Sequence, residues 1–330
     1  MVRYGIIGFG HHAVKRMIPG FREAGDSQLA GLWRRNLEKG RENAQQFAIP
    51  HVFETAEALC ASPEIDAVFI ASPDALHLPD VLLAAKHGKH VLCEKPLGMN
   101  AGEVEQMLAA AKAANVKLGV AQNMRYYRSL ALMRQWISDG RIGQPTLAHS
   151  QFAYAAELSP REWIYDPALA CGGPIGDVGV HCIDSLRFVL RTDVTAVSTL
   201  AHRDAQSGEV ESHAVLALAL AIEAMATVMV TTRASYRSLV EVTGENAVIL
   251  CENALTVDHP IEVVLRKGGK VLESVTVTNA DAYGMMLDGF AQWVEGRGEY
   301  LAPAADGLHN QKVLDAAYAS WRSGQRETIA

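Results

Sequence analysis

A glycine-rich loop near the start of the chain has the spacing of a phosphate-binding turn. Gly8, Gly10 and Ala13 fit the pattern G-x-G-x-x-A between an apolar run and a helical one. The first glycine permits a tight strand-to-helix turn, the second lets the backbone approach a pyrophosphate, and the small third residue lets the helix pack on the strand. Phosphate then binds at the helix N-terminus. The expected dinucleotide contacts in this loop are Gly8, Phe9, Gly10, His11 and His12.

Lys95 is the second residue whose place predicts chemistry. It follows the apolar run His90 to Cys93 and precedes Pro96, which favours an extended backbone at the lysine. Open parallel sheets bind ligands at the carboxyl ends of their strands, so a lysine at such an end is expected where a nicotinamide meets its substrate. Taken alone, a lysine at a turn is more often a solvated charge.

A third candidate group follows a pair of glycines. Asp177 and His181 are four residues apart, so on a helix both side chains lie on one face. A neutral imidazole can accept a hydroxyl proton, and a nearby carboxylate can orient the ring or the substrate. Gly172 and Gly173 predict a loop that approaches a ligand closely. The alternative is that Asp177 only caps the helix and His181 is a core histidine.

The end of the expected second strand indicates which dinucleotide binds. An acidic residue there would bind the free ribose 2′-hydroxyl of NAD, but the sequence has Arg34, Arg35 and, a little later, Lys39. Guanidinium groups suit a 2′-phosphate because their planar fork makes bidentate bonds. We therefore expect NADP. If these charges are only solvated, the protein accepts NAD as well.

The elements around these residues predict the fold. Up to about Gln122, five short apolar runs alternate with helical patterns, which indicates a parallel, doubly wound sheet in a dinucleotide-binding domain of residues 1–122. From residue 123 to 330 most apolar runs read as successive strands joined by turns such as Gly268-Gly269, with a helix near Asp177 to Leu190 and another from Asp306 to Trp321. We expect an α+β domain with an open, mainly antiparallel sheet there.

Composition excludes several classes of protein. The 330 residues, 49% of them hydrophobic, carry a formal net charge of −7 and form no basic cluster, which argues against nucleic acid as a main ligand. The apolar stretch Ala214 to Val230 is interrupted by Glu223, so no membrane span is expected. Five scattered cysteines form no C-x-x-C pair, and the N-terminus shows no signal peptide. These features predict a cytoplasmic protein without a structural metal.

The motifs occur in an order that is specific, although each alone is modest. They are the glycine loop, Ser72-Pro73-Asp74 with His77, Glu94-Lys95-Pro96, Gly140-Arg141-Ile142-Gly143, and Gly172-Gly173 with Asp177 and His181. Together they resemble the glucose-fructose oxidoreductase/inositol dehydrogenase family, also called Gfo/Idh/MocA, over nearly the whole chain. Cys171, the His11-His12 pair and Arg34 depart from the family pattern, which bears on cofactor choice more than on fold.

The resemblance implies a nicotinamide-dependent oxidoreductase. It implies hydride transfer between nicotinamide C4 and a carbinol carbon of a sugar or polyol. Lys95, Asp177 and His181 match the family's catalytic residues: His181 exchanges the hydroxyl proton, Lys95 stabilises charge on the reacting oxygen, and Asp177 orients substrate and histidine. The further cofactor contacts that it suggests are Ser72, Pro73, His77, Glu94 and Lys95.

Other readings stay open at this point. The family also includes non-catalytic members that sense a dinucleotide, and members that act on non-sugar substrates such as diols. Besides Asp177 and His181, the substrate contacts that we expect are Arg125, Tyr126, Trp163, Tyr165 and Tyr283, although each is as well explained by packing. Apolar strands such as Val215 to Leu220 leave one sheet face to be covered, which predicts a homo-oligomer, a dimer or a tetramer.

Overall fold

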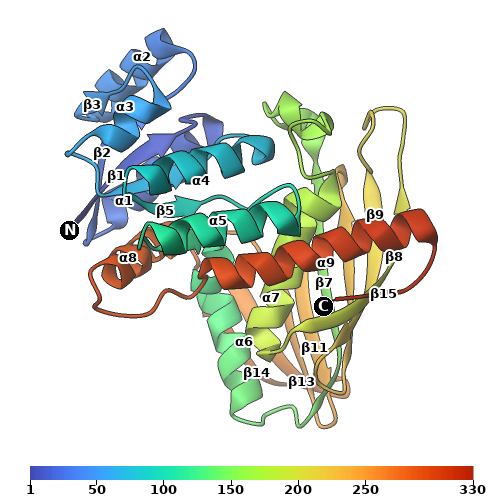
Figure 1. Ribbon diagram of the computed structural model, residues 1–330. Coiled ribbons are helices and arrows are strands. Elements are labelled where there is room, and N and C mark those ends of the chain that lie inside the picture. The colour runs from blue at the N-terminus through green and yellow to red at the C-terminus, as the bar shows by residue number, and fades with distance from the viewer. Residues whose placement is uncertain (330) are drawn as a thin grey trace. The chain divides into compact units, whose positions relative to one another are not determined.

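The computed structural model describes residues 1–329, which form two compact units. The first contains Met1–Asn123 and Tyr283–Leu308, and the second contains Met124–Ala282 and the chain from His309 onward (Figure 1). The sequence places a single boundary after residue 122. In the structure, Tyr283–Leu308 belongs to the first unit instead of the second.

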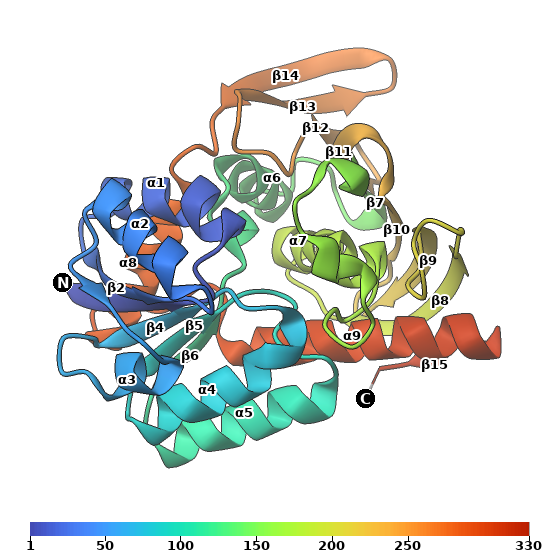
Figure 2. The ribbon, with the colours of Figure 1, turned by 90° about the horizontal axis from the view of Figure 1, so that it is seen from above.

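The first unit is a parallel six-stranded sheet with strand order β3-β2-β1-β4-β5-β6. Figure 2 shows α3, α4 and α5 on one face and α1, α2 and α8 on the other. This confirms the doubly wound domain. The strands are β1 (Val2–Ile7), β2 (Ser27–Trp33), β3 (His51–Val52), β4 (Ala67–Ile70), β5 (His90–Cys93) and β6 (Leu118–Val120). The helices are a π-helical turn (Ala13–Met17), α1 (Ile18–Glu23), α2 (Leu37–Phe47), α3 (Ala56–Ala61), α4 (His77–Lys86), α5 (Ala101–Ala113) and α8 (Ala282–Val294).

Helix α8 returns to this sheet because its aromatic face completes the core there. The hydroxyl of Tyr4 donates to the carbonyl of Leu287 at 3.1 Å, and the Phe290 ring packs beside the Tyr4 ring. On β6, a Cβ at Gly119 would lie 2.7 Å from the Tyr300 ring and 3.0 Å from Phe290. A glycine in the strand therefore makes room for these aromatic rings. Because the contacts join residues far apart in sequence, local patterns do not reveal them.

The second unit contains a nine-stranded sheet with order β14-β13-β12-β11-β7-β10-β9-β8-β15. Its pairs are antiparallel except β7 with β10, so the predicted α+β domain is confirmed. The strands are β7 (Pro145–Ala155), β8 (Val194–His202), β9 (His213–Leu220), β10 (Met225–Thr231), β11 (Arg233–Gly244), β12 (Val248–Glu252), β13 (Ile261–Lys267), β14 (Lys270–Val277) and β15 (Glu327–Thr328). The helices are α6 (Arg128–Ser138), α7 (Val180–Leu190) and α9 (Ala304–Ser323), which begins in the first unit and continues into the second.

Helix α7 is the centre of the second unit. All of its residues are buried, and it packs against β7, β10 and β11 on one face of the sheet. Residues of β9 and β10 alternate between buried and exposed, so every second side chain faces the helices and the others face outward. None of the helices in the described part of the chain is both long and apolar enough to span a membrane.

Candidate functional site

The glycine loop is built as the sequence predicts. Strand β1 ends at Ile7, and Gly8 has a positive φ of 82° that favours glycine. A Cβ at Gly8 would lie only 2.5 Å from the backbone nitrogen of Ser72, whereas a Cβ at Gly10 would find its nearest neighbour at 3.7 Å. Phe9 is 1% exposed, so only its backbone faces the loop. Gly8 is required by the turn, and Gly10 leaves the space that a pyrophosphate needs.

The cations after β2 surround the start of α2. Asn36 caps this helix by accepting a hydrogen bond from the Lys39 backbone N–H at 2.9 Å. The Arg34 guanidinium donates to the Asn43 side chain at 2.8 Å, which fixes its direction. Arg35 and Lys39 are exposed. Three cations thus lie at the carboxyl end of β2, where the sequence predicts a contact with the adenosine ribose.

His77 connects the turns that follow β4 and β5. Its ring is fully buried, with Nδ1 at 3.0 Å from the carbonyl oxygen of Pro96 and Nε2 at 3.0 Å from that of Ser72. The Ser72 hydroxyl donates to Asp80 at 2.7 Å, and Pro73 continues the same turn. Because both ring nitrogens face backbone carbonyls, His77 positions the two turns and offers no ring nitrogen to a nucleotide.

The lysine turn and the glycine loop meet within the first unit. Glu94 accepts a hydrogen bond from the Lys95 backbone N–H at 3.2 Å, and its other oxygen lies 2.9 Å from Nε2 of His12. The Lys95–Pro96 peptide bond is cis. The structure therefore brings Glu94 and Lys95 to the loop that the sequence assigns to the dinucleotide. His11, the neighbour of His12, begins the helical run that follows the loop.

Tyr283 lies close to the glycine loop within the first unit. The sequence assigns it to the second domain, but it belongs to the first unit. Its ring packs edge-on against His12 with centroids 6.0 Å apart, and a Cβ at Gly20 would lie 2.9 Å from the Tyr283 Cβ. The structure thus places this predicted substrate contact beside the glycine loop.

In the second unit, Asp177 is held by two residues that the sequence does not single out. Arg161 binds both of its carboxylate oxygens, at 3.0 and 3.1 Å, and the Tyr154 hydroxyl donates to the same carboxylate. Burial, together with the negative charge of Asp177, raises the pKa of Tyr154 above its ordinary value. Tyr154 is therefore a neutral donor, and Asp177 is an anion paired with a cation.

His181 lies in α7, in the same helical run as Asp177. The run begins with a π-helical segment, Ile175–Gly179, which continues directly into Val180–Leu190. Such π-helical turns occur frequently at functional sites. His181 is 8% exposed, and its ring centroid lies 6.4 Å from that of Phe152 on β7. The helix therefore brings both predicted catalytic residues to consecutive turns.

The glycines before this helix pack closely against other parts of the second unit. Gly172 has a φ of 127°, and a Cβ there would lie 1.8 Å from the Tyr318 hydroxyl. A Cβ at Gly173 would lie 2.0 Å from the backbone oxygen of Glu211. Groups of the protein itself occupy the space that the absent side chains leave. The structure thus accounts for these glycines by the packing of Tyr318 and Glu211, and a ligand contact of this loop stays a prediction.

The remaining predicted substrate contacts are divided between the core and a partly exposed segment. Arg125 is 7% exposed and binds the fully buried Asp184 through two bonds, at 2.9 and 2.6 Å. This pairing keeps the pKa of Asp184 below its usual value despite burial. Tyr126 is buried beside it in sequence, whereas Trp163 and Tyr165 lie half-buried in a short 3₁₀ helix, Glu162–Tyr165.

Comparison with protein families identifies the chain. The model of the oxidoreductase family with an NAD-binding Rossmann fold matches residues 2–122, and that of the GFO/IDH/MocA C-terminal domain matches residues 130–250. The chain belongs to the Gfo/Idh/MocA family of oxidoreductases. The first unit of this oxidoreductase contains its NAD(P)-binding Rossmann fold, and the open Gly10 loop fits such a dinucleotide.

Individual relatives agree with this assignment. The oxidoreductase is 29% identical over 334 residues to the 1,5-anhydro-D-fructose reductase of Ensifer adhaerens, covering 100% of this chain and 99% of the relative. It is 32% identical to the scyllo-inositol 2-dehydrogenase (NADP(+)) of Bacillus subtilis over 56% of each chain. The structure of aldose-aldose oxidoreductase from Caulobacter crescentus superposes with a TM-score of 0.91 at 25% identity, covering 99% of both chains.

Four residues of this oxidoreductase's second unit escape a sequence analysis, and the reason is the same for each. Tyr154 lies on β7, and Arg161 directly precedes the 3₁₀ helix Glu162–Tyr165. Glu211 lies in the β8–β9 connection, and Tyr318 lies on α9. They meet near the Asp177 segment only in the folded unit. The one local signal is Glu211, an acid at the entry to an apolar strand.

Proposed function

We propose that the protein transfers a hydride reversibly between nicotinamide C4 and a carbinol or carbonyl carbon of a sugar or polyol. One observation carries the proposal most directly. The Lys95 turn is joined to the open glycine loop through the His12–Glu94 pair, and to the Ser72 turn through His77. A dinucleotide on that loop is therefore held at the same sheet edge as the lysine.

When bound, the nicotinamide supplies the hydride acceptor or donor at C4. In the oxidation direction, His181 takes the hydroxyl proton of the substrate, and the Lys95 ammonium stabilises the negative charge that develops on that oxygen. Asp177 does not exchange this proton, because Arg161 and Tyr154 already bind its carboxylate as an anion. It orients the substrate hydroxyls and keeps the helix that carries His181 in place.

NADP is the cofactor that the residues favour. Arg34 and Arg35 follow β2 directly, where an NAD-specific protein would carry an acidic residue, and Lys39 lies on the first turn of α2. Arginine pairs with phosphate bidentately, so a ribose 2′-phosphate gains charge-assisted bonds that NAD lacks. The name of the Bacillus subtilis relative includes NADP(+), which supports the same choice.

Nicotinamide absorbance tests the proposal. The purified protein is incubated with NADPH or NADH and a panel of sugars, polyols and keto-sugars, with Lys95→Ala alongside. We expect turnover with NADP(H), and a loss of about 10²- to 10³-fold in Lys95→Ala because a group that stabilises the developing charge is missing. NADPH affinity changes by no more than a few-fold. Lys112→Ala, which removes an exposed lysine at the end of α5, keeps full turnover as the control.

A diol substrate is the second candidate. The chain is 32% identical over 193 residues to the trans-1,2-dihydrobenzene-1,2-diol dehydrogenase of Mus musculus. The same panel therefore includes trans-dihydrodiols. Turnover of these with no turnover of sugars would replace the sugar proposal. Tight NADPH binding with no turnover of any compound would instead support a regulatory protein that senses the dinucleotide.

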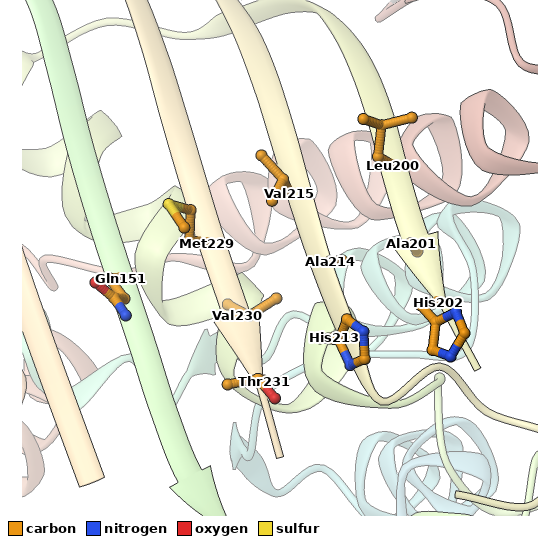
Figure 3. A pocket seen from close by; sticks show the side chains of 10 residues that line it. All are labelled: Gln151, Leu200, Ala201, His202, His213, Ala214, Val215, Met229, Val230 and Thr231. Carbon is orange, nitrogen blue, oxygen red and sulfur yellow. The ribbon is translucent and has the colours of Figure 1, made fainter. Parts of the chain in front are cut away.

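We also propose that the outer face of the second sheet binds a second copy of the chain. Strands β8, β9 and β10 contain no Asp, Glu, Lys or Arg. Leu200 is 78% exposed, Met225 57%, and Val215 and Met229 41% each. Figure 3 shows Leu200, Val215 and Met229 around a shallow hollow on this face. An uncharged apolar sheet face of this kind is typical of an interface. Sedimentation of Val215→Asp tests it: we expect a dimer or tetramer to dissociate, and a monomeric unaltered protein would refute it.

A further inference from the structure

The helical run that carries Asp177 and His181 starts without a capping side chain of its own. Its N-cap is Pro174, which makes no side-chain cap hydrogen bond and has no backbone N–H. The first N–H groups of a helix have no partner within the helix, and buried N–H groups need acceptors. The donors at this end belong to Gly173, Ile175 and Gly176, and all three residues are buried.

Glu211 accepts hydrogen bonds from two of these donors, and Tyr318 in turn binds Glu211. Both residues come from distant parts of the chain, and we call them the Glu211–Tyr318 pair. One oxygen of Glu211 accepts from the N–H of Gly173 at 3.0 Å, and the other accepts from the N–H of Ile175 at 2.8 Å. The Tyr318 hydroxyl donates to Glu211 at 2.9 Å. The N–H groups of Gly173 and Ile175 thus have an acceptor outside the helix.

The pair also explains the two glycines. A methyl group at Gly172 would collide with the Tyr318 hydroxyl, and one at Gly173 would collide with the backbone oxygen of Glu211. Glu211 is 1% exposed, so its carboxylate is shielded from bulk solvent. The segment from Gly172 to Gly176 is therefore fixed by steric contact as well as by hydrogen bonds.

The segment from Gly172 to Gly176 is bonded directly to Asp177. The Asp177 N–H donates to the Gly173 carbonyl at 2.9 Å, so the backbone that Glu211 holds also holds Asp177. Arg161 and Tyr154 bind the Asp177 carboxylate from the other side. A shift of the helix start changes the place of Asp177 relative to Arg161 and turns the helix that carries His181.

The hydrogen-bond donors around Glu211 favour its charged form, although burial outweighs them. Burial raises the pKa of Glu211 above its ordinary value, and the N–H groups of Gly173 and Ile175 and the Tyr318 hydroxyl offset only part of that rise. A negative charge at a helix N-terminus is stabilised by the helix dipole. A neutral carboxamide would lose this attraction and one of the two acceptor oxygens.

We propose that Glu211 is a positioning residue for the reaction, acting with Tyr318 through the backbone of the Asp177 segment. This inference rests on the proposed function of Asp177 and His181. Glu211 itself touches neither of their side chains in any hydrogen bond that the described structure shows. It sets the place of the helix start, and enzymes lose rate steeply when reacting groups move by fractions of an ångström to an ångström.

The test uses three variants of the full chain: Glu211→Gln, Tyr318→Phe and Glu209→Gln. The last removes an exposed carboxylate from the same β8–β9 connection and is the matched control. Two quantities are measured, the amide hydrogen exchange of residues 172–178 and the kinetic constants with the substrate found in the panel. Exchange reports the segment directly, and a separation of kcat from nucleotide affinity distinguishes positioning from general destabilisation.

We expect amide exchange in this segment to accelerate in Glu211→Gln. We expect a smaller acceleration in Tyr318→Phe, because this variant keeps the hydrogen bonds from the Gly173 and Ile175 N–H groups to Glu211. We expect kcat to fall about 10- to 100-fold in Glu211→Gln and by a smaller factor in Tyr318→Phe. NADPH affinity stays unchanged, and Glu209→Gln matches the unaltered protein. If Glu211→Gln does not fold, Tyr318→Phe is compared with Glu209→Gln. The inference then requires faster exchange and a lower kcat in Tyr318→Phe than in Glu209→Gln.

Unchanged exchange, or faster exchange with unchanged kcat, would overturn the inference. So would a fall in activity that only follows the loss of folded protein. Failure of the proposed function gives a different result, because the unaltered protein would then turn over no compound of the panel, whatever the exchange of residues 172–178.

Discussion

Gly10 and the adjacent glycines Gly172 and Gly173 are all predicted from the sequence to let the backbone approach a ligand, yet they differ in structure. A side chain at Gly10 would meet no atom closer than 3.7 Å, whereas side chains at Gly172 and Gly173 would meet Tyr318 and Glu211 at 1.8 and 2.0 Å. The first leaves space open beside a loop that the family uses for a dinucleotide. The second leaves space that the protein fills itself.

The difference teaches what a glycine near a functional residue means. In the proposed function, the missing side chain at Gly10 leaves room for the dinucleotide, so the cost of adding one should appear in binding. At Gly173 the missing side chain serves the folded backbone that carries Asp177, so the cost appears in stability. The same substitution, glycine to alanine, therefore separates the two regions.

The largest effect is expected for Gly173→Ala. Its methyl group would lie 2.0 Å from the Glu211 backbone oxygen, which a backbone cannot accommodate without shifting. We expect the free energy of unfolding to fall by about 2 kcal/mol or more, as for overpacked cores, with turnover lost. Denaturant unfolding measures it. Gly269→Ala, at a hairpin where nothing lies within 4 Å, is the control and should be as stable as the unaltered protein. Full stability in Gly173→Ala would contradict the packing described here.

Gly10→Ala should have the next largest effect, and on a different quantity. The methyl group meets no protein atom closer than 3.7 Å, so the free energy of unfolding should change by less than about 0.5 kcal/mol. It occupies the space for the pyrophosphate, so NADPH affinity should fall at least about tenfold. Calorimetric titration checks this, with Gly298→Ala of the same unit as control. Unaltered affinity would show that the dinucleotide does not use this loop.

Arg34→Ala should give the smallest of the three effects and sharpen the assignment of the cofactor. Loss of a charge-assisted bond to the 2′-phosphate should weaken NADPH binding about tenfold while NADH binding stays the same. Arg41→Ala removes an exposed arginine from α2, the helix that follows Arg34, and should change neither affinity. Equal weakening of both dinucleotides would mean that Arg34 does not read the 2′-phosphate.

The contrast also marks how far the sequence predicts this molecule. The alternating pattern up to Gln122 predicts the Rossmann sheet because parallel strands and their helices are contiguous there. The sequence does not predict β3, because a strand of two residues is too short to show a periodic pattern. The position of Tyr283–Leu308 could not be predicted, since it depends on Tyr4 and Gly119 contacting residues more than 160 positions away.

The candidate site divides in the same way. Gly8, Lys95, Asp177 and His181 stand in local motifs, so the sequence singles them out. The residues that bind Asp177 and the start of its helix do not stand in local motifs. Tyr154, Arg161 and Glu211 approach from three separate parts of the chain. Arg125 has a functional signal in sequence, yet its guanidinium is bound to the buried Asp184, and burial of that pair is visible only in the structure.

The central proposal is that Gly10 belongs to the dinucleotide site and that His181 is the proton acceptor of the reaction. A parallel measurement of NADPH affinity and kcat in Gly10→Ala and His181→Ala tests it most directly. The account predicts that Gly10→Ala binds NADPH weakly, whereas His181→Ala binds it like the unaltered protein and loses turnover by about 10²- to 10⁴-fold. His181→Ala with full turnover, or with NADPH affinity lost, would contradict it.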